Sequence, residues 1–183
     1  YEPSVREFPK RFAPLIEGLE RNHLSVITGN NATELLPSGR QFLQALLRAI
    51  YAAKNHIHIE TYIIEDDAIG QLVADALADK AREGVEVRLL YDDVGCWRVP
   101  ETFFHRLEKA GVRCAAFEPV RFPSLTRKVN YRNHRKVCII DGHTGFIGGM
   151  NLALRYAPLR AADWLDMQLQ LKGESVCALQ RIF

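Results

Sequence analysis

The stretch "YRNHRKVCIIDGHTGFIGGMN" (131–151) decides the fold that this sequence predicts. Within it, "RKVCIID" (135–141) has the pattern of a short strand. The tight turn "DGHTG" leads from this run into a second short run, "FIGG". We therefore expect two short strands here, with polar side chains gathered before the first and after the second.

Around this stretch, strand patterns alternate with helix patterns. "HIHIETYII" (56–64) alternates strictly between two kinds of side chain, which is typical of a strand. Residues 36–55 carry apolar side chains at helical spacing, with Ser38 as a plausible N-cap. Further strands are expected at 23–29, 85–93, 112–119 and 164–173, and further helices at 5–21, 66–84, 100–111 and 174–183. The alternation predicts an α/β fold with a mainly parallel mixed β-sheet, flanked by helices on both faces.

Length and composition are those of a globular protein. The chain has 183 residues, of which 48% are hydrophobic and 25% charged, and its net charge of +2 does not single out nucleic acid as a partner. No window approaches the ~20 apolar residues of a membrane-spanning helix. The four cysteines are scattered without metal-ligand spacing, which predicts reduced, mostly buried thiols in an intracellular protein and no metal site: Cys96, Cys114, Cys138 and Cys177.

The polar residues of the opening stretch suit the chemistry of phosphate. His134 and Lys136 are two residues apart, so in a strand they project from the same face, while Asp141 belongs at the strand end. The glycine pair that ends at Gly149 permits close backbone approach, and Asn151 can bring an amide to the same place. An imidazole that can attack phosphorus, an ammonium and an amide would together bind a tetrahedral anion. Each residue alone would be an ordinary polar side chain, and only the joint spacing favours a site.

A basic segment leads into this site. Residues 121–136 contain six lysines and arginines and no acid. Such a run is either a solvated basic loop or a surface for an anionic ligand. Because it joins the His-Lys pair directly, we favour the anionic ligand.

The spacing H-x-K-x(4)-D-x(6)-G-G-x-N resembles the HKD motif of the phospholipase D superfamily. The resemblance extends beyond the motif. "GNNATELLPSG", "LADKAREGVEVRLLYDDVG" and "WLDMQLQLKGESVCALQRIF" resemble, in the same order, parts of the N-terminal catalytic half of bacterial cardiolipin synthases. It covers the chain from about residue 22 to the end, so we expect residues 1–22 to form an appended helix and residues 23–183 to form one phospholipase D-like α/β domain.

The resemblance implies a role for each site residue. His134 would be the nucleophile or its proton-transfer counterpart, and Lys136 with Asn151 would bind the phosphodiester. Asp141 would complete the motif and support its charge network. The resemblance also implies that the carboxylate of Asp166 bonds the imidazole, while Gly149 supports the site. Glu60 and Tyr62 are further candidates for lining it, unless they belong to an ordinary polar sheet face. No cofactor and no metal is implied.

The superfamily builds one site from two HKD motifs, and this chain has one. The second motif would come from a missing C-terminal half or from a second copy. We expect a phosphatidyltransferase that acts on phosphatidylglycerol, an anionic phospholipid, through a phosphohistidine intermediate. The fragment itself would be soluble, and the parent enzyme would act at the cytoplasmic face of a bacterial inner membrane. Nucleic acid is not expected as a partner.

Two other functions remain open at this point. One is a single-motif phosphodiesterase or nuclease that is complete as a homodimer. The other is a non-catalytic module that binds anionic lipid through the basic segment. Fold and superfamily do not choose among these, because function depends on the site.

Overall fold

The computed structural model describes residues 10–21, 27–120, 132–157 and 165–183. Its helices are η1 (Lys10–Phe12), α1 (Ala13–Arg21), α2 (Gly39–Ala52), α3 (Ala68–Arg82), α4 (Glu101–Lys109), η3 (Leu154–Tyr156) and α5 (Ser175–Ile182). Its strands are β1 (Ala32–Leu36), β2 (His56–Thr61), β3 (Glu86–Asp92), β4 (Arg113–Phe117), β5 (Val137–Ile140), β6 (Thr144–Gly148) and β7 (Gln168–Lys172).

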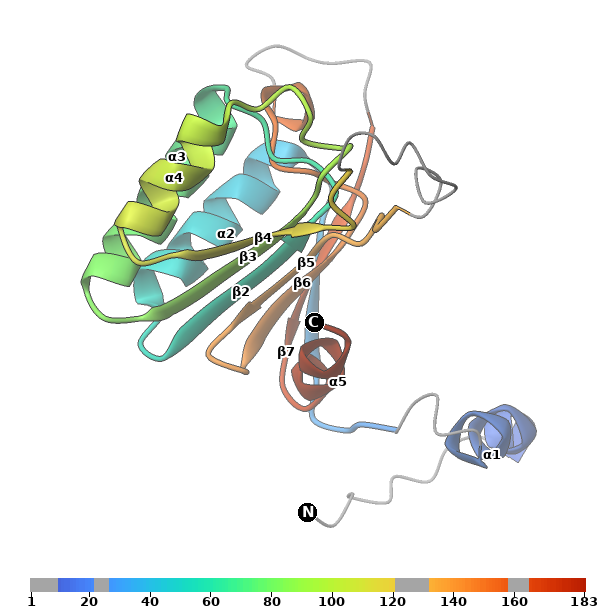
Figure 1. Ribbon diagram of the computed structural model, residues 1–183. Coiled ribbons are helices and arrows are strands. Elements are labelled where there is room, and N and C mark those ends of the chain that lie inside the picture. The colour runs from blue at the N-terminus through green and yellow to red at the C-terminus, as the bar shows by residue number, and fades with distance from the viewer. Residues whose placement is uncertain (1–9, 22–26, 121–131, 158–164) are drawn as a thin grey trace.

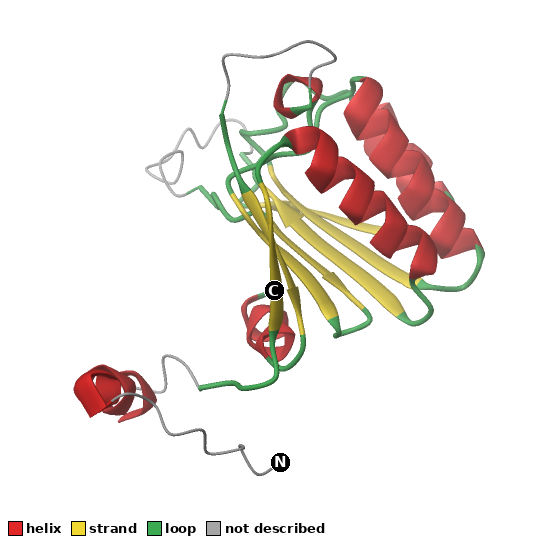
Figure 2. Cartoon of the chain, turned by 180° about the vertical axis from the view of Figure 1, so that it is seen from behind, coloured by secondary structure: helices red, strands yellow, loops and turns green. Residues whose placement is uncertain are grey.

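The strands form one seven-stranded sheet in the order β1-β7-β6-β5-β2-β3-β4. Helices α2, α3 and α4 cover one face of the sheet and α5 lies on the other (Figures 1 and 2). The predicted α/β class, the mixed sheet and the helices on both faces are therefore confirmed. The helix predicted at 36–55 begins after Ser38, whose hydroxyl accepts a hydrogen bond from the backbone N–H of Gln41.

The expected predominance of parallel pairing is wrong. Among the paired strands of the described residues, only β2–β3 and β3–β4 are parallel, because a helix crosses over between the strands of each pair. The other four pairings are antiparallel. The turn between β5 and β6 is only three residues long, and a connection that short can join antiparallel strands only.

The first strand also lies elsewhere than predicted. Residues 27–29 of the expected strand 23–29 are not in a strand, and residues 23–26 fall outside the described part of the chain. Within the described residues the first strand is β1, which pairs with β7 at one edge of the sheet. Four of its five residues are exposed. An exposed edge strand whose apolar and polar residues do not alternate lacks the pattern from which strands are predicted.

The sheet has a different core on each of its two faces. On the face of α2, α3 and α4, Ile57 and Ile59 of β2 are fully buried. On the face of α5, a smaller cluster joins Val137 and Ile139 of β5 to that helix. The residues of β2 that were expected to form a polar face point to this same side of the sheet. They are buried too: His58 is only 8% exposed and Glu60 only 2%. The second core therefore buries polar groups that need partners.

The ends of the strands define the place of the site. Strands β2, β3, β4 and β6 end, and β5 and β7 begin, at the same end of the sheet. We call this the site end, because the loops that leave it carry His134, Lys136 and Asn151. In a sheet of this kind, side chains from several strand ends can meet there.

Candidate active site

His134 and Lys136 lie in the segment that leads into β5, and their side chains meet. The Nζ atom of Lys136 lies 3.1 Å from Nδ1 of His134 and donates a 2.7 Å hydrogen bond to the backbone oxygen of the same residue. His134 is exposed, whereas Lys136 is only 5% exposed. The motif therefore combines a solvent-accessible imidazole with a buried ammonium that contacts its Nδ1 atom.

The aromatic ring of Tyr62 forms one wall of this place. Tyr62 follows the end of β2, and its ring centroid lies 4.5 Å from that of the His134 imidazole. The ammonium of Lys136 lies 5.2 Å from the centroid of the same ring. The ring excludes water from one side of both groups and attracts the cation. This places Tyr62, one of the further candidates, at the site.

Two opposing effects act on the charge of Lys136. Burial lowers the pKa of its ammonium, and the negative charge of Asp166 raises it, with burial the larger of the two. An anion that binds beside a lysine favours the charged form of its ammonium. An anion would therefore stabilise the charge of Lys136, which burial makes unfavourable. The site is therefore suited to an anionic ligand.

Asn151 binds the chain just after Tyr62, at Ile63, and much of its amide is already engaged. Its Oδ1 accepts a 3.0 Å hydrogen bond from the backbone N–H of Ile63, and its Nδ2 donates to the hydroxyl of Tyr156 at 2.6 Å. An amide nitrogen carries two hydrogens, so the contact with Tyr156 leaves one for a ligand. The residue is buried at 4% exposure, which fixes its orientation.

Gly149 leaves the space in which the Asp166 carboxylate lies. A Cβ atom at this glycine would stand 2.1 Å from Oδ1 of Asp166. Asp166 itself accepts a 2.7 Å hydrogen bond from the backbone N–H of Met167. No hydrogen bond joins Asp166 to His134 in the described part of the chain, and the group that lies at Nδ1 of the imidazole is the ammonium of Lys136.

Asp141 is not brought to this site. It follows the far end of β5, where its carboxylate accepts backbone hydrogen bonds from Lys54, Asn55 and His56 at 2.7–2.9 Å. Burial raises its pKa, but these three bonds and the charge of His56 outweigh that effect and lower it. Asp141 thus holds the connection between α2 and β2, and the charge network expected for it at His134 does not form.

Glu60 lies on the α5 face, behind the backbone that carries His134. Its Oε1 accepts a hydrogen bond from the side chain of Asn133 and lies 3.7 Å from Nη1 of Arg135. Sequence reasoning missed Asn133 and the fully buried Asp92, whose Oδ2 accepts a hydrogen bond from the backbone N–H of Asn133. The only signal for Asp92 was its position at the end of the predicted strand 85–93.

Part of the predicted basic segment can be followed in the structure. Residues 121–131 lie outside the described part of the chain. Of the rest, Arg132 lies 3.6 Å from the carboxylate of Asp92, and Arg135 lies beside Glu60. These two arginines are thus partly neutralised by buried acids, and the cation that faces the imidazole is Lys136.

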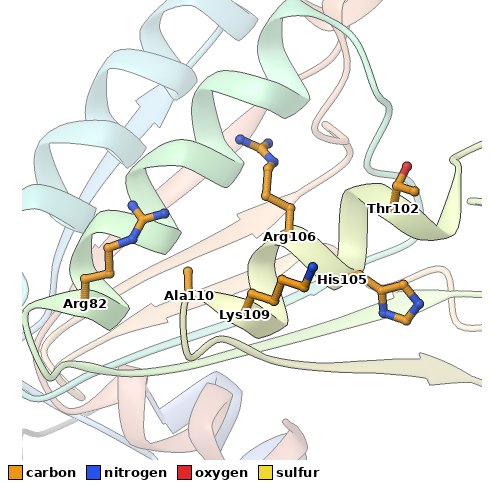
Figure 3. A pocket seen from close by; sticks show the side chains of 6 residues that line it. All are labelled: Arg82, Thr102, His105, Arg106, Lys109 and Ala110. Atoms are coloured by element: carbon orange, nitrogen blue, oxygen red, sulfur yellow. The ribbon is translucent and has the colours of Figure 1, made fainter.

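A cavity of about 560 Å³ opens at the site end beside Tyr62. Trp97 and Arg98 line one part of it, and Asp66 and Arg155 line another. A second cavity, of about 390 Å³, lies by α4 and the end of α3 (Figure 3). No residue of the motif lines the second cavity, and its Arg82 and Arg106 already pair with Asp79 and Asp75.

The described residues contain no group of three His, Cys, Asp or Glu side chains that could hold a metal ion. Within the same residues, no helix is both long enough and apolar enough to cross a membrane. Cys96 and Cys138 are buried, Cys114 is partly buried and Cys177 is exposed, and all four are free thiols.

Comparison with known families identifies the domain. The model of the family described as "Cardiolipin synthase, PLD-like domain" matches residues 46–162, which include the whole motif. The chain belongs to this family. PLD stands for phospholipase D, so the family membership expected from the motif is confirmed.

Curated relatives agree with this assignment. The chain is 45% identical over 159 residues to cardiolipin synthase 2 of Bacillus anthracis, covering 86% of this chain and 31% of that protein. It is 40% identical over 171 residues to the major cardiolipin synthase of Bacillus subtilis, covering 92% of this chain and 36% of that protein. This PLD-like domain thus spans about a third of the length of the cardiolipin synthases it matches.

Solved structures share the fold at lower identity. NucT from Helicobacter pylori superposes with a TM-score of 0.66 at 18% identity, covering 84% of this chain and 93% of that one. Phosphatidylserine synthase from Haemophilus influenzae superposes with a TM-score of 0.65 at 18% identity, covering 81% of this chain and 35% of that one. The mixed seven-stranded sheet is therefore a phospholipase D fold.

Proposed function

We propose that this PLD-like domain supplies half of the active site of a phosphatidyltransferase that makes cardiolipin from phosphatidylglycerol. The observation that carries the proposal is the contact between the exposed imidazole of His134 and the buried ammonium of Lys136. The 40–45% identity to cardiolipin synthases supports the substrate class. The reaction would take place at the cytoplasmic face of a bacterial inner membrane, where the anionic phospholipid lies.

The reaction would proceed in two displacements at phosphorus. A motif imidazole nitrogen attacks the phosphodiester of one phosphatidylglycerol, forming a P–N bond and breaking the P–O bond to the glycerol headgroup. A second imidazole gives its proton to the departing glycerol oxygen. The hydroxyl of a second phosphatidylglycerol then attacks the phosphohistidine and loses its proton to the second imidazole. The P–N bond breaks, and cardiolipin is released.

The contact between Lys136 and Nδ1 of His134 determines which tautomer the imidazole adopts before substrate binds. An ammonium has no acceptor, so Nδ1 must accept its proton and the ring proton of neutral His134 lies on Nε2. In that state Nε2 can donate a proton but cannot attack phosphorus. A phosphodiester oxygen would compete for the ammonium of Lys136. Binding would thereby release Nδ1 and permit the other tautomer, in which Nε2 is the nucleophile.

The second imidazole must come from outside this single motif. We propose residues 23–183 as one phospholipase D-like half and residues 1–22 as an appended helix. The other half-site would come from a second motif in a longer enzyme or from a second copy of this chain. Either source would place two imidazoles on opposite sides of the phosphorus.

An activity assay tests the proposal. The 183-residue chain and the complete gene product are incubated separately with phosphatidylglycerol vesicles and with DNA, and cardiolipin and cleaved phosphodiesters are measured. We expect cardiolipin from the complete product only, and its loss in His134→Ala and Lys136→Ala variants but not in Lys172→Ala, which changes an exposed lysine at the far end of β7.

Two outcomes would contradict the proposal. Cleavage of DNA by the 183-residue chain, lost on dilution, would assign the site to a homodimeric nuclease. Binding to anionic vesicles that survives His134→Ala and Lys136→Ala, without any phosphodiester chemistry in the complete product, would assign it to a non-catalytic module.

A further inference from the structure

Asn133, the residue before His134, makes one backbone and two side-chain hydrogen bonds in the described part of the chain. The backbone N–H of Asn133 donates to Oδ2 of Asp92 at 3.1 Å, and its side-chain Nδ2 donates to Oε1 of Glu60. Its side-chain Oδ1 accepts a 3.1 Å hydrogen bond from the backbone N–H of Arg135. The last bond closes a turn whose central residue is His134.

The two acids that hold Asn133 are buried and come from neighbouring strands. Asp92 ends β3 and is 0% exposed, and Glu60 lies in β2 and is 2% exposed. Burying a carboxylate is unfavourable unless it is well paired. Yet Oε2 of Glu60 has no hydrogen-bond partner among the described residues. Two buried acids, whose burial is energetically unfavourable, thus lie beneath residues 132–136, which belong to no helix or strand.

Further contacts of the two acids reach the loop that follows β3 and the residues on both sides of His134. Asp92 also accepts a 2.8 Å hydrogen bond from the backbone N–H of Gly95 and lies 3.6 Å from Nη1 of Arg132. Arg135, which lies beside Glu60, donates a 3.2 Å hydrogen bond to the backbone oxygen of Ile182 in α5. The residues on both sides of His134 are therefore tied to the sheet, while the imidazole stays exposed.

We propose that Asn133 is the positioning residue of His134. Its side-chain amide links Glu60 to the turn around His134, while its backbone N–H binds Asp92, and together these contacts fix the direction in which the imidazole points. The inference rests on the proposed function, since it gives His134 a reacting role. It explains why an asparagine is needed, because this side chain both donates to Glu60 and accepts from Arg135. Alanine offers neither contact, and aspartate would add a third negative charge beside two buried ones.

Two variants and one matched control test the inference. Asn133→Ala removes both side-chain contacts, and Asn133→Asp keeps an acceptor for Arg135 but loses the donor to Glu60. Asn55→Ala is the control, because Asn55 is exposed and is held by Asp141 through its backbone N–H only. Unfolding midpoints in urea establish that each variant is folded before it is compared.

The first readout is the imidazole of His134 in histidine-labelled chain, observed by NMR with and without inorganic phosphate. We expect both Asn133 variants to shift and broaden the His134 signals and to weaken their response to phosphate, while Asn55→Ala leaves them unchanged. The second readout is kcat and KM for cardiolipin formation by the complete gene product. Misplacing a reacting group by about 1 Å can cost ~100-fold in rate, so we expect kcat to fall ~10- to 100-fold with KM within about twofold.

These readouts separate the inference from the function on which it rests. Unchanged His134 signals in both folded Asn133 variants would overturn the inference even if the complete product makes cardiolipin. Lower urea midpoints with unchanged kcat would also overturn it, because Asn133 would then be structural only. If His134→Ala leaves transfer unchanged, the proposed function fails, and the inference that His134 is positioned for reaction fails with it. The changes in the His134 signals would then report only how well residues 132–136 are held in place.

Discussion

Asp141 and Lys136 belong to one sequence motif, yet they lie at opposite ends of β5. Lys136 immediately precedes the strand and Asp141 immediately follows it. Five residues of extended chain span roughly 16 Å, which is too far for the two charges to share one ligand. Lys136 supports the imidazole of His134, while Asp141 binds three backbone N–H groups before and at the start of β2.

The first prediction concerns Asp141. We expect Asp141→Asn to lower the free energy of unfolding by ~1–3 kcal/mol, because the amide group cannot accept three N–H bonds as the carboxylate does. The response of His134 to inorganic phosphate should stay unchanged. Urea unfolding and NMR measure the two effects, with Asp79→Asn on the exposed side of α3 as the control. If Asp141→Asn abolished the phosphate response without lowering the free energy of unfolding, Asp141 would have a role in the active site.

The pH dependence of this effect has a definite sign. The pKa of Asp141 is lower in the folded chain than its ordinary value of 3.8. A lowered carboxyl pKa stabilises the fold above the unfolded value, and this stabilisation is lost as pH falls from about 4 through the folded pKa. The difference in stability between wild type and Asp141→Asn should therefore shrink below about pH 4. A difference that persists there would mean that the charge is not its source.

The second prediction concerns His58, which is held neutral beneath α5. Burial is the largest cause that lowers its pKa below 6.5, while its hydrogen bond to Glu86 acts in the opposite direction. The side chain of Gln180 in α5 lies 2.9 Å from Nδ1 of His58, and the ring of Phe183 stacks on it. Protonation at Nδ1 would remove the acceptor for that amide, so α5 should pack less tightly.

The expected result is a loss of stability in mild acid. A lowered histidine pKa gives stability that is present above 6.5 and is lost as pH falls through the folded value. We expect the free energy of unfolding to fall as the pH is lowered below about 6.5, and this slope to flatten in His58→Gln. His105→Gln, at an exposed position in α4, should keep the wild-type slope. Equal slopes in all three proteins would contradict the prediction.

The third prediction concerns Gly149. A methyl group there would overlap the Asp166 carboxylate, so Gly149→Ala should displace that side chain. Because the charge of Asp166 raises the pKa of Lys136, its displacement should lower that pKa further. NMR of labelled lysine measures the change, and Asp166→Asn should reproduce it. Gly18→Ala in α1, where a Cβ meets no atom within 4 Å, is the control.

The fourth prediction concerns the tautomer of His134. In the free chain at neutral to alkaline pH, we expect the ring proton on Nε2, because Nδ1 accepts from Lys136. Inorganic phosphate should shift the population toward the other tautomer by drawing the ammonium away. Nitrogen chemical shifts of the imidazole measure both states. In Lys136→Met, which keeps a long side chain without the charge, the preference for Nε2 and its response to phosphate should both disappear.

Much of the fold follows from local sequence patterns. The helix around Phe42 and Leu46 and the strands predicted at "HIHIETYII" and "RKVCIID" each contain one observed element, although both strands are shorter than predicted. Spacing on one face is a local property, so the sequence can show it. Pairing direction is not local. The antiparallel pairing of β2 with β5 joins residues about 80 positions apart, and no pattern within either strand encodes it.

The sequence by itself determined the α/β class, the family and the residues that could carry phosphate chemistry, because the spacing of His134, Lys136 and Asn151 is written along the chain. Only the tertiary structure decided which of these residues meet. It brought Lys136 and Tyr62 to His134, bound Asp141 to backbone N–H groups before and at the start of β2, and placed Asp92 and Glu60 beneath Asn133. The physical reason is that the site forms where several strands end. Which strand ends come together depends on how all the strands of the sheet pair and on which face of the sheet is buried.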